Sequence, residues 1–392
     1  MLSKRAKEIK PSPTLTIDSK AKAMKAEGLD VISFGVGEPD FDTPENIKEA
    51  GIKAVRDGFT KYTAVGGTDK LKDAIIGKLE ADNGLAYGRA EIIVSCGAKH
   101  SLYNAMQALL DPGDEVVIPA PYWVSYPEQV ALAGATPVFV KTLEADRFLL
   151  TAAAFEKSVT GRTKALILNS PSNPTGFSYD SEALGRIAEI AVKNGIYIIS
   201  DEIYEKLLYD GARHVSIASL GEEVRKRTIV VNGVSKAYSM TGWRIGYAAG
   251  PAPLIKAMTS IQSQSTSNPT SISQAAAVEA LTGPQDSVSR MRAEFDKRRR
   301  RIVKALNAIE GIRCIPPTGA FYVFPNTRAL YAKSPVISSS SKLAMYLLEK
   351  AMVAVVPGDA FGDDDFIRLS YATGIGQIEK GVERIRAALQ AL

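Results

Sequence analysis

The stretch SKAYSMTGWRIGY occupies residues 235–247. It places Lys236 in a loop of small residues, directly after the apolar run TIVVNGV at residues 228–234. Eight residues after the lysine, Arg244 opens a second apolar run at residues 245–249. The pattern predicts two buried strands and, between them, a loop that carries one amine and one guanidinium.

These two side chains suggest a particular chemistry. A lysine forms Schiff bases when its amine can lose a proton in a shielded site, and an arginine holds phosphate through paired, charge-assisted hydrogen bonds. Lys236 and Arg244 together therefore indicate an aldehyde cofactor that bears a phosphate, namely pyridoxal phosphate. The alternative is a pair of solvated surface charges, because most lysines and arginines are exposed.

Composition restricts the class of protein. A chain of 392 residues, 45% hydrophobic and 23% charged, is typical of a soluble globular protein with two domains. Residues 1–14 lack the apolar segment of a secretory signal, and no apolar run reaches the ~18 residues of a membrane span. The two cysteines, Cys96 and Cys314, fit a reducing cytoplasm. With only His100 and His214 as histidines, we expect no metal site.

One dense basic run is a candidate for nucleic-acid binding. The net charge is +5, and residues 297–301 read KRRRR within a helical pattern. No aromatic residues interleave with these charges. We therefore interpret the run as a solvated helix face and expect no nucleic-acid partner.

Strand-like apolar runs alternate with helical patterns, which predicts an α/β fold with a mainly parallel sheet. Thr43 as N-cap, Pro44 as first helical residue and Glu45 in the first turn predict a helix that ends near residues 57–58. Further helices are expected at residues 98–110 and 181–193. The expected strands are residues 92–95, 115–118, 165–168, 196–200 and 229–231.

The pattern changes after a long helix expected at residues 287–309. Short strands and helices follow, which predicts a smaller α+β domain. The first forty or so residues lack βαβ periodicity and are expected to pack with it. We therefore expect a large domain at residues 46–288 and a small domain formed by residues 1–45 and 289–392.

Polar residues follow several expected strands, and parallel sheets bind ligands beyond these strand ends. Gly97 and Ala98 begin a helix, where free backbone N–H groups make a phosphate seat. Two prolines near Asn173 force a rigid loop. Asp201 and Tyr204 suit the nitrogen and the ring oxygen of a pyridine cofactor. The alternatives are tight turns for the glycine and helix capping for Asp201.

Two further residues complete a candidate site. Trp123 follows a strand end and offers a ring for stacking, although a core tryptophan is the common alternative. Arg368 lies inside the apolar run FIRLS, where a cation needs a partner. A substrate carboxylate is a natural bidentate partner, and a structural salt bridge is the alternative.

The order and spacing of these motifs resemble those of class I aminotransferases of fold type I, most closely the bacterial branch Ib of aspartate aminotransferases. The resemblance runs from IKPS at residues 9–12 to IRLSYAT at residues 367–373. It implies a mainly parallel, seven-stranded-type sheet between helices, with a smaller α+β domain. Its most specific motifs are GEPDFDTP, PYWVSYPE, NSPSNPTG, SDEIYE, SKAYSMTGWRIGY and VVPG.

The resemblance also implies a role for each matching residue around the cofactor ring. Lys236 matches the lysine that forms the Schiff base with pyridoxal phosphate and moves the proton at the substrate Cα. Asp201 matches the partner of the pyridine nitrogen. Tyr204 and Asn173 match the residues that hydrogen-bond the ring oxygen, and Trp123 matches the stacking aromatic ring.

A second set of matches concerns the phosphate. Arg244 matches the phosphate-binding arginine, and Gly97, Ala98 and Lys99 match the helix start beside it. Tyr62 matches a tyrosine that reaches the phosphate of the neighbouring subunit, which implies a homodimer with shared active sites.

One position departs from the pattern. Many relatives carry a hydroxyl three residues before the lysine, where this chain has Gly233. Ser235 or another donor would then contact the phosphate.

The resemblance further implies an amino-acid and 2-oxo-acid substrate site. Arg368 matches the clamp on the substrate α-carboxylate, and a lysine such as Lys99 is associated with dicarboxylates in this branch. The mobile N-terminal segment of the family matches residues 10–14. The implied substrate-binding residues are Gly37, Lys10, Thr14, Lys99, Trp123, Asn173 and Arg368.

The expected activity is ping-pong transamination between L-aspartate and 2-oxoglutarate, yielding oxaloacetate and L-glutamate. Relatives that pair Lys10 with Arg368 include enzymes accepting prephenate, so a bifunctional enzyme is the first alternative. Another aminotransferase or a C–S lyase on the same scaffold is the second. A regulator with a ligand-sensing domain of this type is disfavoured, because no residues remain for a DNA-binding domain.

Overall fold

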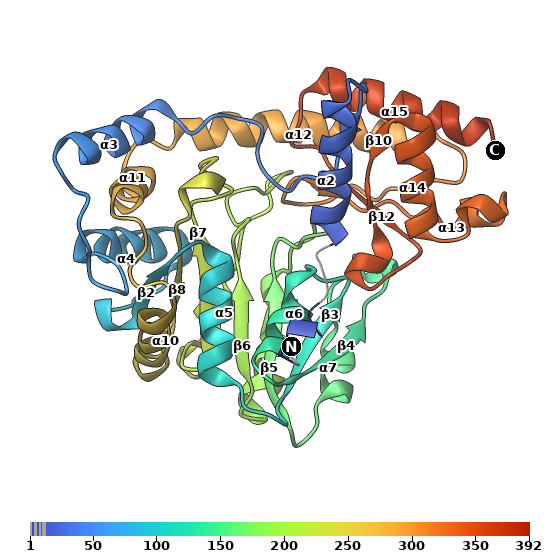
Figure 1. Cartoon of the computed structure of the whole chain (residues 1–392). Helices are drawn as coiled ribbons and strands as arrows, with labels where there is room; N and C mark the ends of the chain where they lie inside the picture. The colour runs from blue at the N-terminus through green and yellow to red at the C-terminus, as the bar shows by residue number, and fades with distance from the viewer. Residues whose placement is uncertain (1, 4–5, 8, 10–12) are drawn as a thin grey trace.

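A seven-stranded sheet forms the centre of the protein (Figure 1). The computed structural model describes residues 2–3, 6–7, 9 and 13–392. The strands lie in the order β2-β8-β7-β6-β5-β3-β4, and only β8 runs antiparallel to its neighbours. The mainly parallel α/β fold expected from the sequence is confirmed. The strands are β2 (Ile92–Ser95), β3 (Glu115–Ala120), β4 (Thr136–Lys141), β5 (Thr163–Asn169), β6 (Tyr197–Asp201), β7 (Thr228–Gly233) and β8 (Gly246–Ala249).

Helices cover both faces of this sheet. Ile93 and Val231 pack on one face with residues of α5, α6 and α10. On the other face, Val94 and Val230 pack with α4 and α11, and Leu166 packs with α7 and α8. Because both faces are buried, most of these strands read as continuous apolar runs. The helices are α4 (Asp69–Asn83), α5 (Ala98–Leu109), α6 (Ser125–Leu132), α7 (Ala152–Ser158), α8 (Ser181–Lys193), α10 (Ala252–Ser265) and α11 (Ser271–Thr282), with the short α9 (Glu222–Arg225) near the sheet.

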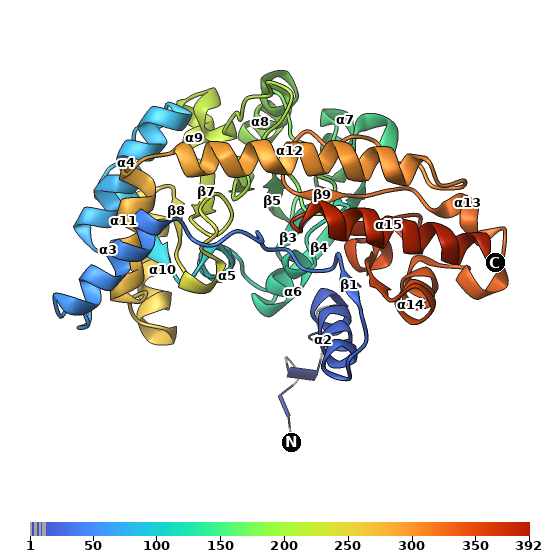
Figure 2. The same cartoon turned by 90° about the horizontal axis from the view of Figure 1, so that it is seen from above.

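A smaller group of elements from the C-terminal part lies beside the main sheet (Figure 1). A three-stranded sheet in the order β11-β12-β9 shares an apolar core with α12, α14 and α15. Helix α12 runs across the molecule, from near α4 and α11 to its packing partner α15 (Figure 2). These elements are β9 (Tyr322–Val323), β11 (Val356–Pro357), β12 (Ile367–Ser370), α12 (Asp286–Asn307), α13 (Arg328–Tyr331), α14 (Ser340–Ala351) and α15 (Ile375–Gln390).

The N-terminal segment packs with this C-terminal part, as expected. Strand β1 (Ile32–Ser33) pairs in parallel with β10 (Val353–Ala354). Helix α2 (Pro13–Ala26) contributes Ile17 to a small apolar cluster that includes Leu348 of α14. The pairing joins segments more than 300 residues apart in the chain.

Three adjacent strands bring their carboxyl ends to one edge of the main sheet. Strands β5 and β6 are parallel with Asn169 opposite Asp201, and β6 and β7 are parallel with Asp201 opposite Val231. The loops that follow β5 and β7 carry Asn173 and Lys236. Ligands of such sheets bind beyond this edge.

The start of α3 (Glu45–Arg56) differs from the expectation. Pro44, not Thr43, occupies the N-cap position, and no side chain caps the helix. The Thr43 hydroxyl instead donates to the carbonyl oxygen of Ser239 at 2.7 Å and accepts from the Trp243 indole at 3.0 Å. The Thr43 hydroxyl therefore forms tertiary hydrogen bonds and does not cap the helix. The expected end near residues 57–58 is confirmed, with Asp57 as C-cap.

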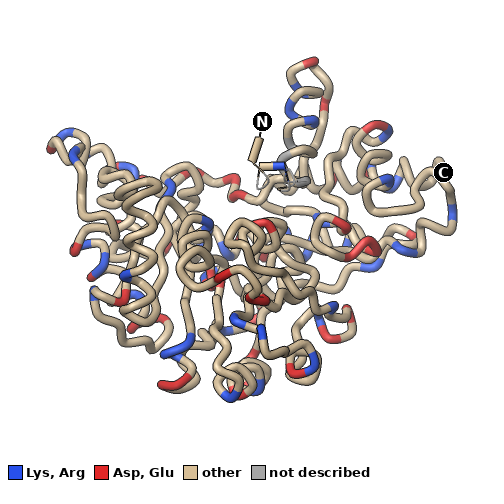
Figure 3. Tube along the Cα trace, turned by 60° about the horizontal axis from the view of Figure 1, so that its bottom comes forward, with Lys and Arg blue, Asp and Glu red and all other residues tan. Residues whose placement is uncertain are grey.

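The basic run on α12 is not a purely solvated helix face, so that interpretation was wrong in part. Arg298 is buried and forms an ion pair with Asp40 at 2.6 Å, and Arg299 is buried and pairs with Asp210 at 2.7 Å. Along the chain trace, acidic and basic positions are mixed on helices and loops (Figure 3). Among the described residues, no helix combines the length and the hydropathy needed to cross a bilayer.

Candidate active site

A cavity of about 330 Å³ lies beyond the carboxyl ends of β5, β6 and β7. It collects side chains from segments that are far apart in the sequence. The residues expected from the sequence that line it are Thr14, Gly37, Ala98, Lys99, Trp123, Asn173, Asp201, Tyr204, Ser235, Lys236, Arg244 and Arg368.

Lys236 lies in the loop after β7, and its Nζ donates to the carbonyl oxygen of Gly37 at 2.6 Å. Burial, with smaller contributions from Arg244 and Arg368, lowers the pKa of the Lys236 amine to about 8. Glu38 and Asp201 oppose this shift. A lysine of this kind has a substantial neutral fraction near neutral pH, which a nucleophilic amine requires.

Arg244 lies against the N-terminus of α5. Its guanidinium donates to the carbonyl oxygens of Thr241 at 2.7 Å and Cys96 at 3.2 Å. Gly97 precedes the helix with a φ of +87°, and a Cβ on it would lie only 2.2 Å from Arg244 Nη2. The glycine therefore permits the guanidinium and the helix N-terminus to share one small region. Both groups attract anions.

The structure gives a physical reason for Gly233, the position that departs from the family pattern. A Cβ at Gly233 would lie 3.0 Å from both the Gly246 Cα and the Ile245 carbonyl oxygen of the neighbouring strand segment. A larger side chain therefore requires a shift between β7 and β8. Ser235 is buried and lines the cavity.

Asp201 ends β6 and is buried within the cavity wall. Burial raises its pKa to about 6, and hydrogen bonds from Tyr126 and from the Ile203 backbone partly offset this effect. The Tyr126 hydroxyl donates to Asp201 Oδ2 at 2.7 Å. Asn169 also donates to the Asp201 backbone carbonyl at 2.9 Å, which joins the ends of two strands.

Tyr204 and Asn173 each contact a second residue of the cavity. The Tyr204 hydroxyl lies 2.8 Å from the Tyr322 hydroxyl, and both rings are buried. The Asn173 backbone N–H donates to Asn169 Oδ1 at 2.8 Å, which fixes its loop on β5. The Asn173 side-chain oxygen accepts from Arg368 at 3.1 Å. The Asn173–Pro174 bond is cis.

Arg368 on β12 is almost completely buried, with 2% of its surface exposed. Its guanidinium lies over the rings of Tyr322 and Phe361 and donates to the carbonyl oxygen of Gly35 and to Asn173. Its Nε is buried without a hydrogen-bond partner among the described residues. A buried guanidinium with an unused donor can bind a carboxylate.

Lys99 and Trp123 meet at the rim of the cavity. The Lys99 Nζ lies 4.8 Å from the centre of the Trp123 ring. Partial burial and the charge of Arg244 lower the pKa of Lys99. Trp123 packs edge-on against Tyr126, with ring centroids 5.3 Å apart and an interplanar angle of 81°.

Two expected residues among those described, Gly97 and Tyr62, do not line this cavity. Gly97 supports it through its contact with Arg244. Tyr62 is 92% exposed and lies outside the lining residues of this chain's cavity. Lys10 lies outside the described residues.

Sequence reasoning missed two tyrosines that contact the site, Tyr126 and Tyr322. Both occur in apolar segments, where a tyrosine is most often part of a core. Tyr126 lies in the motif PYWVSYPE at residues 121–128, and Tyr322 lies in the apolar run AFYVF at residues 320–324.

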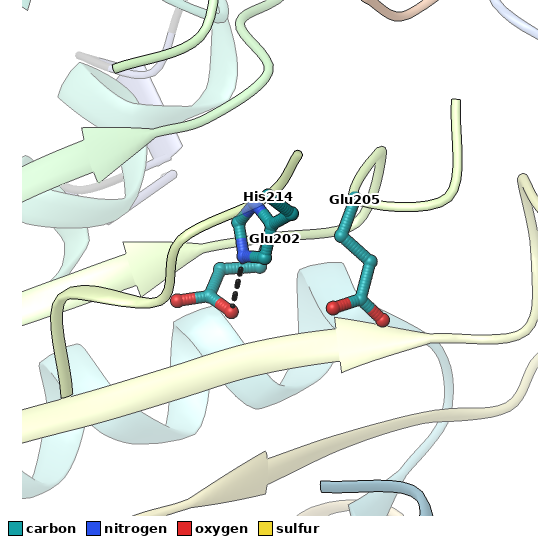
Figure 4. A group of neighbouring side chains, drawn as sticks. All are labelled: Glu202, Glu205 and His214. Carbon is teal, nitrogen blue, oxygen red and sulfur yellow. Dashed lines mark hydrogen bonds and ion pairs between the residues drawn. The ribbon is translucent and has the colours of Figure 1, made fainter. Parts of the chain in front are cut away.

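A separate polar cluster lies behind the site and contains Glu202, Glu205 and His214, whose ligand atoms lie within 4.8 Å of one another (Figure 4). His214 Nε2 lies 2.9 Å from Glu202 Oε2. Glu205 pairs with the Lys78 ammonium and accepts from Asn83 at 2.9 Å. Burial raises the pKa of Glu205, but the positive charges of Lys78 and His214 outweigh it, and the pKa is about 2. Both carboxylates therefore have partners within the protein.

The fold and the site together define a class of protein. A family model described as "Aminotransferase class I and II" matches residues 29–385, and the chain belongs to this family. The resemblance noted in the sequence is thereby confirmed.

Individual relatives support the same assignment. The chain is 54% identical to an aspartate aminotransferase of Geobacillus stearothermophilus, covering 100% of this chain and 99% of that protein. It is 50% identical to a probable aspartate/prephenate aminotransferase of Rickettsia conorii, with coverage of 100% and 99%. The crystal structure of the aspartate aminotransferase from Rhizobium meliloti matches with a TM-score of 0.95 and 47% identity, covering 100% and 99% of the two chains.

Proposed function

We propose that this aminotransferase is a pyridoxal-phosphate-dependent aspartate aminotransferase. It transfers the amino group of L-aspartate to 2-oxoglutarate in two half-reactions, yielding oxaloacetate and L-glutamate. The observation that carries the proposal is that the Lys236 amine, Asp201 and Arg244 line one cavity with Arg368, whose Nε has no hydrogen-bond partner among the described residues.

The residues present fit pyridoxal phosphate. Arg244 and the N-terminus of α5 supply donors for a phosphate, and the absence of a side chain at Gly97 leaves room for both. Asp201 offers a buried carboxylate for the pyridine nitrogen. The hydroxyl of Tyr204 can accept from Tyr322 and donate to the ring oxygen. When bound, the cofactor supplies an electron-withdrawing ring that stabilises negative charge at the substrate Cα.

The chain's own groups supply binding and proton transfer. The Lys236 amine, with its pKa lowered to about 8, would hold the cofactor covalently and, when free, could accept or donate the proton at the substrate Cα. Arg368 orients the substrate through its α-carboxylate, with Asn173 beside it. Trp123, in the loop before α6, lines the cavity and would stack on the cofactor ring.

Charge at the rim supports a dicarboxylate substrate. Lys99 and Thr14 line the same cavity as Arg368, so a second cation faces the space next to the carboxylate clamp. A lysine there favours aspartate and glutamate over neutral amino acids. Lys10, the third residue expected in this role, lies outside the described residues.

Aspartate/prephenate transamination is the second candidate. The observation that favours it is the set of relatives at 48–50% identity that carry this name, including the Rickettsia conorii protein. Another aminotransferase activity on the same scaffold is a further alternative. A C–S lyase is disfavoured, since the relatives described above are named aminotransferases.

We also propose a cytoplasmic homodimer with shared active sites. Tyr62 is exposed, and so are the nearby apolar side chains of Ile52, Val55 and Phe59 on and after α3. An exposed apolar group of this kind supports an interface, from which Tyr62 reaches the phosphate of the second subunit. The division into a domain of residues 46–288 and one of residues 1–45 with 289–392 belongs to the same proposal.

A panel of donors and acceptors tests the function. Purified enzyme with pyridoxal phosphate is assayed with aspartate, glutamate, alanine, tyrosine and arogenate against 2-oxoglutarate and prephenate. We expect the highest kcat/KM for aspartate with 2-oxoglutarate. A preference for alanine or tyrosine contradicts the proposal, and efficient use of prephenate establishes the second candidate.

A further inference from the structure

Tyr126 is the feature of the site that the proposed function leaves without a role. It lies in the first turn of α6, and only 2% of its surface is exposed. Its hydroxyl donates to Asp201 Oδ2 at 2.7 Å, whereas the other carboxylate oxygen accepts a longer bond of 3.3 Å from the Ile203 backbone. The phenol is therefore the closer of the two donors that hold the Asp201 carboxylate.

The direction of this hydrogen bond is fixed by chemistry. Burial, together with the adjacent charge of Asp201, raises the pKa of Tyr126 well above that of an ordinary tyrosine. The phenol therefore keeps its proton and acts as donor, and the carboxylate acts as acceptor. A hydrogen bond to a charged acceptor is about twice as strong as a neutral one.

The ring of Tyr126 makes a second contact with the site. It meets Trp123 edge-to-face, an arrangement that aromatic quadrupoles favour. One residue thus contacts both Asp201 and Trp123, the groups assigned above to the nitrogen and to the face of the cofactor ring.

We propose that Tyr126 is a positioning residue for the cofactor: its hydroxyl holds Asp201 toward the pyridine nitrogen, and its ring holds Trp123 over the cofactor plane. This inference rests on the proposed function. Tyr126 acts through these two residues and is not a catalytic residue itself.

Electrostatics give the hydroxyl a specific effect. Burial already raises the pKa of Asp201 to about 6, and the bond from Tyr126 is the largest of the influences that lower it. Without this bond the pKa rises further, and a larger fraction of Asp201 is neutral at neutral pH. A neutral acid no longer holds a protonated pyridine nitrogen through an ion pair.

The test is Tyr126→Phe, which keeps the ring and removes only the hydroxyl. We expect the dissociation constant for pyridoxal phosphate to rise about tenfold to a hundredfold, the effect of losing a hydrogen bond to a charged group. The value of kcat falls while KM for aspartate changes little, because Arg368 is untouched. The acid limb of the kcat profile moves to higher pH, which a purely structural role would not produce.

Tyr179→Phe is the matched control. Tyr179 is also buried, and its hydroxyl accepts from the Leu150 backbone at 2.9 Å, away from Asp201. We expect this variant to keep the cofactor affinity and the pH profile of the unmodified protein. If Tyr126→Phe behaves like this control, the positioning role is wrong.

A double-mutant cycle distinguishes a positioning role of Tyr126 through Asp201 from a purely structural role. In an Asp201→Asn background, Tyr126→Phe should add no more than a few-fold loss of cofactor affinity, because its charged partner is gone. A full additional loss overturns the positioning role through Asp201. Thermal unfolding of each variant identifies any loss that comes from misfolding. If the unmodified protein binds no pyridoxal phosphate, the proposed function itself fails.

Discussion

The Nζ of Lys236 lies 2.6 Å from the backbone carbonyl oxygen of Gly37, a residue 199 positions earlier in the chain. The hydrogen bond holds the amine at the cavity wall before any ligand arrives. It also brings Glu38, the largest of the influences that raise the pKa of the lysine, close to the site. The reactivity of Lys236 therefore depends on a segment outside the main sheet.

The first prediction concerns capture of pyridoxal phosphate by the cofactor-free protein. With a pKa of about 8, Lys236 gains its neutral, nucleophilic form as pH rises. We expect the rate of covalent capture to increase from pH 6 and to level off above about 8. Stopped-flow absorbance between pH 6 and 10 measures this rate. Glu38→Gln should move the midpoint to lower pH, because Glu38 raises this pKa.

Lys236→Ala is the control for this experiment. It should abolish both covalent capture and transamination, while non-covalent binding persists. Substantial transamination in this variant means that the assignment of Lys236 is wrong.

A second prediction concerns substrate choice at the rim. Lys99→Ala should lower kcat/KM for aspartate about thirtyfold or more, the effect of truncating one partner of a close charge pair. The value for alanine should change by less than about threefold, since alanine carries no second carboxylate. Steady-state kinetics with both donors measure the ratio. Lys256→Ala, at an exposed position on α10, is the control. Equal losses for both donors contradict the dicarboxylate role.

A third prediction concerns the carboxylate clamp. Arg368→Lys keeps the charge but loses the planar fork that binds a carboxylate bidentately. We expect kcat/KM to fall about a hundredfold for every amino-acid donor, with little change in pyridoxal phosphate affinity. Equilibrium dialysis and donor kinetics measure the two quantities. A loss confined to dicarboxylic donors would show that Arg368 binds the side chain instead.

A fourth prediction concerns stability and His214. Burial and the charge of Lys78 lower the pKa of His214, whereas Glu202 and Glu205 raise it. The two carboxylates have the larger effect, so the pKa lies above the usual 6.5. Because the folded-state pKa is raised, the stabilisation is complete below pH 6.5 and is lost as pH rises through the folded-state value.

His214→Gln tests this dependence. It should lower the free energy of unfolding by about 3 kcal/mol at pH 6, the order of magnitude for breaking a buried pair. The difference from the unmodified protein should shrink as pH increases toward 9. Urea unfolding at several pH values measures it. A difference that is constant with pH would mean that the charge of His214 contributes nothing.

Much of the fold was accessible from the sequence because local patterns determine it. The continuous apolar runs of β5, β6 and β7 predict buried strands, and the residues at their ends predict a ligand edge. The start of α3 was predicted wrongly, since the Thr43 hydroxyl bonds Ser239, which is 196 residues away. The antiparallel direction of β8 has no local signal either.

In the candidate site, too, residues with a local sequence signal could be predicted, and residues defined by distant contacts could not. Lys236, Asp201 and Arg368 stand out because charged residues are rare next to apolar strands. Tyr126 does not stand out, because its bond to Asp201 spans 75 residues and its local surroundings resemble those of a core tyrosine. The burial of Arg298 could not be predicted, because its partner Asp40 lies 258 residues away.

Two glycines shape the region between Arg244 and the N-terminus of α5, where we propose that the phosphate binds. A Cβ at Gly97 would lie 2.2 Å from the Arg244 guanidinium, and a Cβ at Gly246 would lie 2.0 Å from the Ala98 backbone nitrogen. A side chain at position 246 would therefore clash with the backbone of α5, and a side chain at position 97 is disfavoured by its φ of +87° and would displace the Arg244 guanidinium. The rim residues Lys99 and Thr14 carry no such restriction. Specificity in this protein can therefore diverge by point mutation while the anion-binding framework stays invariant.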